Sequence, residues 1–159
     1  MCVVCKKKRV IAGFTLIEIS IVVLIISVLA AITIPALIRS RIHANEASTI
    51  WNLRAISTAQ VSFYSSHNTY GSFDSLVNGM PTTPITRYLD ESWSEGCIRQ
   101  GYVYSMPEAT NVRFVCYASP ETLGYSGNRY FRVDHTGIIR YNETQLPSDS
   151  DPVIGDPPN

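Results

Sequence analysis

The sequence predicts an α+β fold in which a long N-terminal helix packs against a small antiparallel sheet. Residues 19–38 form an uncharged apolar run, and residues 39–66 contain neither Gly nor Pro and repeat apolar side chains at helical spacing. From residue 101 onward, short alternating segments are separated by turn-forming residues, which is typical of β-hairpins. We therefore expect one helix over residues 14–66 and a globular β-rich domain over residues 67–159.

The apolar run has the length of a membrane span. Twenty residues without a charge make a helix of about 30 Å, which is the thickness of a bilayer core. We expect residues 14–38 to be transmembrane rather than the buried helix of a soluble domain. A secretory signal cleaved near Ala30 and Ala31 is a further alternative. The apolar residues that continue to Ile38, and the acidic Glu18 within the segment, argue against it.

The 13 basic and 13 acidic residues balance, but they are unevenly distributed. Four basic residues lie together at positions 6–9, so the chain beyond Gly13 carries nine basic and 13 acidic residues. An acidic body speaks against nucleic acid as a partner. Basic residues before a single span favour a cytoplasmic N-terminus, so we expect the chain after Arg39 to lie outside the cytoplasm.

The second half of the predicted helix is amphipathic. We expect its apolar face to pack on the sheet, with the following residues on that face: Ile42, Ala47, Ile50, Leu53, Ile56, Ala59 and Phe63. The turn-forming segment HNTYGS at 67–72 should end the helix. The segment DSLVNG that follows suits a short helical turn ending at Gly79.

Two β-hairpins are predicted in the remainder. The segments GYVYSM and VRFVCYA are joined by PEATN, and the segments NRYFRV and GIIRY are joined by DHTG. The first hairpin places Met106 opposite Val112, and the two hairpins together predict about four strands. The segment MPTTP at 80–84 reads as a loop. Residues 146–159 are rich in Pro, Asp and Ser, so we expect a mobile or loosely draped tail.

The segment KKKRVIAGFTLIE at 6–18, followed by the apolar run, resembles the class III signal of type IV pilins and type II secretion pseudopilins. The resemblance is specific up to about residue 45. It implies that a prepilin peptidase cleaves between Gly13 and Phe14, removes a basic leader of residues 1–13, and leaves an N-methylated Phe14. A residue without a Cβ suits a bond that must enter a protease site.

The resemblance implies a pilin-like fold and a structural role, not an enzymatic one. The expected function is that of a subunit of a type IV pilus-like filament, assembled through its apolar helix. Expected partners are identical or related pilin subunits, the prepilin peptidase and methyltransferase, and an inner-membrane assembly platform. The chain would cross the bacterial inner membrane once before it enters an extracellular pilus. A pseudopilin of a periplasmic type II secretion pseudopilus is the alternative. A membrane-anchored binding domain is less favoured, because it would need neither the Gly-Phe junction nor Glu18.

Two residues inside the apolar helix, Glu18 and Pro35, are unfavourable there, so their presence requires a physical reason. A charged side chain at the bilayer centre costs about 2.5–3.5 kcal/mol, so Glu18 should gain a partner. The resemblance implies the amine of Phe14 in a neighbouring subunit, although in a single subunit the carboxylate could extend to the headgroups instead. Pro35 removes a helical hydrogen bond. We expect either a kink or local melting over residues 31–35, or a proline that the membrane helix tolerates.

Cys97 and Cys116 are the cysteines of the predicted external part, because Cys2 and Cys5 leave with the leader. An oxidising compartment favours a disulfide between Cys97 and Cys116. The expected hairpin register requires Cys97 to fold back to reach its partner, so two free buried thiols are the alternative.

Catalytic and cofactor patterns are lacking in the sequence. The three histidines, His43, His67 and His135, fall in different predicted elements without metal-ligand spacing. We therefore expect no catalytic residue, no cofactor and no metal site. Carboxylates of the tail could offer oxygen ligands to Ca²⁺, which is a less favoured alternative. They are Asp149, Asp151 and Asp156. The lack of a convincing calcium loop slightly favours a pilus over a pseudopilus.

Overall fold

The computed structural model describes residues 13–79 and 86–155. The chain divides into two compact units, Met1–Leu37 and Ile38–Asn159. Helix α1, Leu16–His67, contributes residues to both units and agrees with the predicted helix to within two residues at either end.

Three sequence expectations lie wholly or partly outside the described residues. The basic leader is described only at Gly13, so nothing is said of Cys2 and Cys5. The segment at 80–84 and the tail carboxylate Asp156 also lie outside.

In the N-terminal unit, α1 is apolar on all sides, and every described residue up to Leu37 is exposed. By length and composition, α1 is the one helix among the described residues that could cross a membrane, with a mean hydropathy of 3.0 in its most apolar window. Its hydroxyl groups donate to carbonyls one turn earlier: those of Ser20, Ser27 and Thr33, at 2.9, 2.7 and 2.8 Å. The helix thus satisfies these polar groups internally, as a lipid environment requires.

In the C-terminal unit, the second half of α1 buries one face. The buried residues recur every three or four positions: Ile42, Glu46, Thr49, Leu53, Ile56, Ala59, Gln60 and Phe63. The predicted face is therefore largely confirmed, but two of its assignments need correction. Ala47 is exposed and Ile50 is only half-buried. Three polar residues occupy the buried face instead, because each finds hydrogen-bond partners there.

The chain reverses after α1 through contacts between Gln60 and Gly71. The Gln60 side-chain amide donates to the Gly71 carbonyl at 2.6 Å, and the Gly71 N–H donates back to the Gln60 Oε1 at 2.9 Å. A Cβ on Gly71 would lie 3.0 Å from the ring of Phe63, so the turn needs a residue without one. Helix α2, Phe73–Asn78, follows and ends at Gly79, as predicted.

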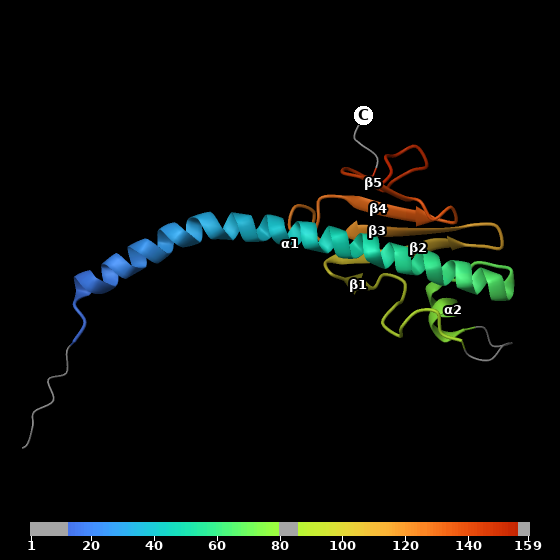
Figure 1. The fold of residues 1–159 in the computed structure, drawn as a ribbon, viewed down its shortest axis with the longest axis horizontal. Coiled ribbons are helices and arrows are strands. Elements are labelled where there is room, and N and C mark those ends of the chain that lie inside the picture. The colour runs from blue at the N-terminus through green and yellow to red at the C-terminus, as the bar shows by residue number, and fades with distance from the viewer. Residues whose placement is uncertain (1–12, 80–85, 156–159) are drawn as a thin grey trace, which may run out of the picture. The chain divides into compact units, whose positions relative to one another are not determined.

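Within the described residues, five antiparallel strands form one sheet, with strands that follow one another in the sequence as neighbours (Figure 1). They are β1 (Ile98–Arg99), β2 (Tyr102–Ala109), β3 (Phe114–Pro120), β4 (Tyr130–Asp134) and β5 (Ile139–Asn142). The two predicted hairpins correspond to β2 with β3 and to β4 with β5. Strand β1 is additional, and at two residues it is too short to show an alternating pattern.

The β2–β3 hairpin differs from its predicted register. Strand β2 continues through Pro107, and the turn lies at residues 110–113, where the Thr110 N–H donates to the Arg113 carbonyl at 2.9 Å. The register shifts between Ser105 and Glu108, which is a bulge around Pro107. Proline lacks an N–H and is tolerated at such bulges. The placement of Met106 opposite Val112 was therefore wrong.

The core of the C-terminal unit joins the buried face of α1 to α2 and the sheet, and α1 runs across the sheet (Figure 1). Aromatic residues fill much of it: Phe63, Phe73, Trp93, Tyr102, Tyr104, Phe114 and Phe131. Trp93 stacks on Phe73 and meets Tyr104 edge to face, with ring centroids 5.8 and 5.1 Å apart. Such pairs add to the area that they bury.

The described part of the tail is held against the sheet. Pro152 accepts the Tyr141 N–H at 3.0 Å, and Ile154 donates to the Ile139 carbonyl at 2.9 Å. Arg132 forms an ion pair with Asp149 at 2.5 Å. Up to residue 155 the tail therefore lies along the sheet, because β5 offers its free edge to these backbone groups. Mobility of the tail stays a prediction.

Candidate functional site

The junction between Gly13 and Phe14 is open. A Cβ built on Gly13 would meet nothing within 4 Å, and Phe14 is 79% exposed. The packing of the described residues therefore gives no reason for a glycine at this position. The junction is sterically accessible to a protease, which is what the predicted cleavage requires.

Glu18 closes a capping box at the start of α1. Its N–H donates to the hydroxyl oxygen of Thr15 at 3.3 Å, and its carboxylate accepts the Thr15 N–H at 3.5 Å. Such reciprocal bonds satisfy two backbone donors that the first helical turn leaves free. This role of Glu18 was not predicted from the sequence, although the T-x-x-E spacing of TLIE at 15–18 is its signature.

The capping box leaves the carboxylate able to bind another group. A carboxylate offers about four lone-pair positions, and Thr15 uses one of them. In a chain that begins at Phe14, the amine would lie one residue before the box. Cap formation and pairing of Glu18 with an amine are thus compatible, and the pairing across subunits stays a prediction.

Pro35 lies inside an unbroken helix. α1 is continuous from Leu16–His67 with Pro35 among its residues. The single subunit therefore shows no local melting at residues 31–35. A kink and a tolerated proline both agree with an unbroken helix, so these two alternatives stay open. Loosening of the helix during assembly stays a prediction.

The outer face of α1 continues beyond the apolar run as a row of small and apolar residues. Trp51 is 69% exposed, and the Arg54 guanidinium lies 5.6 Å from its ring centroid. Ala47, Ala55 and Val61 are also exposed. Within the C-terminal unit this face of α1 is left uncovered, so it is open to a partner outside the subunit.

The predicted disulfide between Cys97 and Cys116 is not formed, and both residues are free thiols. The order of the strands explains this. Cys97 lies just before β1 and accepts the Tyr104 N–H from β2, whereas Cys116 lies in β3. Two strand spacings amount to about 9.5 Å, and cysteines whose Cα atoms are more than about 7 Å apart cannot be bridged without backbone movement. Burial raises the pKa of the Cys116 thiol, and the nearby carboxylate of Glu95 raises it further.

The predicted histidines do not form a site. His67 stacks on Phe63 with centroids 4.3 Å apart, whereas His43 and His135 are exposed in other elements. Among the described residues, no group of three or more His, Cys, Asp or Glu side chains is placed to hold a metal ion.

The tail carboxylates that were considered for Ca²⁺ have protein partners. Asp149 pairs with Arg132, and Asp151 accepts from Ser148 and Asn142. These hydrogen bonds lower the pKa of Asp151, so it is a carboxylate at neutral pH. Guanidinium and amide groups thus occupy directions that a cation would need. Whether Ca²⁺ binds stays untested.

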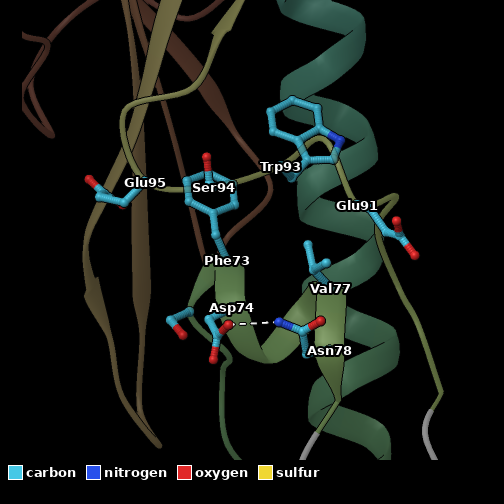
Figure 2. Close-up of a pocket in the computed structure, with 9 residues that line it drawn as sticks. Phe73, Asp74, Val77, Asn78, Glu91, Trp93, Ser94 and Glu95 are labelled. Atoms are coloured by element: carbon cyan, nitrogen blue, oxygen red, sulfur yellow. Dashed lines mark hydrogen bonds between the residues drawn. The ribbon is translucent and has the colours of Figure 1, made fainter.

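A hollow of about 470 Å³ lies between α2 and the segment that precedes β1 (Figure 2). Its three carboxylates each have a partner within the chain. Asp74 accepts from Asn78 at 2.8 Å, Glu95 accepts the Met106 N–H at 2.9 Å, and Glu91 pairs with Arg87 at 2.5 Å. Phe73 and Trp93 form part of its wall. The hollow therefore contains no nucleophile paired with a base, and it gives no reason to assign an enzymatic activity.

An ion pair between the buried Glu46 and the half-buried Arg129 was not found from the sequence. Two Arg129 nitrogens donate to the Glu46 carboxylate at 2.6 and 2.9 Å, and the Asn128 N–H donates at 3.0 Å. Burial, and then the charge of Glu46, raise the pKa of the neighbouring Tyr102. The signal was present, because Glu46 falls at helical spacing between Ile42 and Thr49.

Together, the accessible junction, the exposed apolar helix and the small α+β domain define a membrane-anchored protein whose anchor has no cover of its own. Residues 8–34 match the family model for the prokaryotic N-terminal methylation motif.

Three proteins with known names are similar to this chain. The type IV major pilin protein PilA of Myxococcus xanthus is 44% identical over 69 residues, which are 43% of this chain but only 31% of that pilin. Type II secretion system core protein G of Vibrio cholerae is 27% identical over 119 residues, covering 75% of this chain and 78% of that protein. Protein G of Aeromonas hydrophila is 24% identical over 102 residues, covering 64% and 68%. The chain is therefore similar both to a type IV pilin and to type II secretion pseudopilins, and the similarity to the pilin spans less than a third of that protein.

Proposed function

We propose that the chain is a structural subunit of a type IV pilus-like filament. The observation that carries the proposal is the apolar helix at residues 16–37, which is exposed on every side and begins at an accessible Gly-Phe junction. Lipid can cover such a surface in the membrane. Once the subunit leaves the membrane, only the apolar helices of other subunits can cover it, because exposing this area to water is unfavourable.

The proposed processing follows from the same segment. A prepilin peptidase would cleave after Gly13, and a methyltransferase would modify the amine of Phe14. The apolar helix then stays attached to the domain, which is held outside the cytoplasm until an assembly platform incorporates it. The new amine would pair with the Glu18 carboxylate of a neighbouring subunit, which offsets the cost of a charge in an apolar bundle.

A pseudopilin of type II secretion is the second candidate. The extent of the similarity supports it, because the protein G relatives match over 78% and 68% of their lengths, whereas the Myxococcus pilin matches over 31%. Both candidates use the same helix and the same processing. They differ in where the filament ends, at the cell surface or in the periplasm.

The N-terminus of the mature protein tests the processing. Mass spectrometry should find chains that begin with methylated Phe14, and Gly13→Leu should leave the full precursor in the membrane fraction. Val10→Leu in the leader is a matched control that should be cleaved normally. Mature chains that begin near Ala31 would instead establish a secretory signal and end the filament proposal.

The location of the filament separates the two candidates. Fibres sheared from the cell surface should contain the chain when examined by electron microscopy and mass spectrometry. Fibres that lack the chain, together with a loss of protein secretion when it is deleted, would support the pseudopilin instead.

A further inference from the structure

The connection between β3 and β4 forms a fixed turn over residues 121–127. The Asn45 side-chain amide of α1 donates to the Ser126 carbonyl at 2.8 Å, and the Thr122 N–H donates to the Ser126 hydroxyl at 2.9 Å. A Cβ on Gly127 would lie 2.0 Å from the hydroxyl of the buried Tyr102, so the backbone approaches closely there. The shape of the turn is thus set by the core beneath it.

This fixed turn presents two apolar side chains to the outside. Leu123 is 55% exposed and Tyr125 is 50% exposed. The Arg41 guanidinium lies 5.3 Å from the centroid of the Tyr125 ring and donates to its hydroxyl at 3.4 Å. Figure 1 shows this connection at the end of the sheet beside the cyan part of α1, opposite the end at which β2 joins β3.

The turn lies close to where the apolar run ends. Arg41 comes three residues after Ile38, which is about 4.5 Å along a helix axis. The headgroup layer on each side of the bilayer core is about 5–8 Å thick. Asn45 is one turn further on, and helical side chains tilt toward the N-terminus. By its separation along the chain, the side chain of Arg41 is therefore within reach of the headgroups, and so is that of Tyr125, which contacts Arg41.

We propose that the turn at residues 121–127 binds the phospholipid surface beside the span, through Leu123 and Tyr125 and with Arg39 and Arg41. The proposal rests on the proposed membrane span and goes beyond the role of filament subunit. It assigns a lipid-facing surface to the globular domain, which would hold the domain at a fixed height on the membrane until assembly removes it.

The chemistry of the four side chains fits lipid. Tyrosine is enriched at membrane interfaces because its ring is apolar and its hydroxyl remains hydrated. Leu123 can enter the upper acyl chains, and the exposed Arg39 and Arg41 can pair with phosphates. Glu121 is the one acidic residue in the turn, so the arginines outnumber it.

Tryptophan fluorescence in phospholipid vesicles tests the contact in the full chain. In a Trp51→Phe background, Tyr125→Trp and Leu123→Trp report on the turn. Val112→Trp is the matched control, because Val112 is 72% exposed but lies in the turn between β2 and β3. The buried Trp93 gives the same background in all variants. Lipids brominated near the headgroup serve as one quencher and aqueous acrylamide as the other.

We expect brominated lipid to quench the two variants in the turn at least about twofold more than the control, and acrylamide to show the reverse order. The result should persist when vesicles hold on average less than one chain each. If the chains float with the vesicles but brominated lipid quenches the variants in the turn and the Val112→Trp control equally, the lipid contact of the turn is overturned and the membrane span is not. Protection that disappears on dilution would assign the turn to a neighbouring subunit and would also overturn it. Chains that do not float would refute the span itself.

Discussion

The two halves of α1 are parts of one helix with opposite environments. Both are rich in β-branched residues, yet every residue from Leu16 to Leu37 is exposed, whereas residues 42–63 bury a regular stripe. The first half has no polar face, and the second half has one. A helix that is apolar all round needs cover on every side. The contrast teaches that the second half is completed by its own subunit and the first half is completed only by lipid or by other subunits.

The largest effect is expected in the first half, from Glu18→Val. This change removes the only carboxylate of the apolar helix and leaves the proposed Phe14 amine without a partner. Since an unpaired buried charge costs about 3–5 kcal/mol, the yield of sheared fibres should fall at least tenfold, while cleavage after Gly13 continues.

Glu18→Gln and Thr15→Ala separate the charge from the cap. Gln retains the capping box but not the charge, so its fibre yield should also fall. Thr15→Ala removes one of the two capping bonds and retains the charge, so its fibres should still form. Normal yield from Glu18→Gln would contradict the pairing and leave Glu18 as a cap.

Truncating one side chain in each half of α1 compares the two halves by their effect on the free energy of unfolding. Phe63 in the second half is fully buried, so Phe63→Ala should lower the free energy of unfolding by about 3–5 kcal/mol. Leu29 in the first half is exposed, so Leu29→Ala should change it by less than about 0.5 kcal/mol. Urea titration of the full chain in detergent micelles, followed by Trp93 fluorescence, measures both. Equal shifts would show that the two halves unfold as one structure.

The ion pair between Glu46 and Arg129 should contribute less. Glu46→Ala leaves the Asn128 N–H and the Arg129 guanidinium without their acceptor. The free energy of unfolding should therefore fall by about 1–3 kcal/mol. Glu143→Ala, at an exposed carboxylate that lines a surface hollow together with Glu46 and Arg129, is the control and should have little effect. The same urea titration measures the free energy of unfolding of both variants. An equal loss in the Glu46→Ala and Glu143→Ala variants would mean that the ion pair adds no stability.

The smallest effect is expected when a reducing agent is added to the chain, because Cys97 and Cys116 form no disulfide that it could break. Because strand β2 separates Cys97 from Cys116, the mature chain should take up two alkyl groups when it is denatured without reduction, as mass spectrometry can measure. In the native chain, Cys116 should react slowly even at mildly alkaline pH, since its raised pKa keeps it a thiol. A chain that takes up no label until it is reduced would restore the disulfide.

Features with a local signal were predicted well. The long helix and its amphipathic half, the short helix ending at Gly79 and the two hairpins each follow from spacing within a few residues. The capping box was equally local but was overlooked, because Glu18 was considered only as a charge in an apolar segment.

The sequence by itself determined that the chain has a membrane-length apolar helix that follows a Gly-Phe junction, because length, apolar character and order along the chain suffice for both. Only the tertiary structure decided which distant residues meet. The bulge at Pro107 shifts the register, strand β2 keeps the two thiols apart, and Glu46 finds Arg129 at a separation of 83 residues. The physical reason is that helical and strand periodicities are local, whereas strand order, register and buried ion pairs depend on how the whole chain closes around one core.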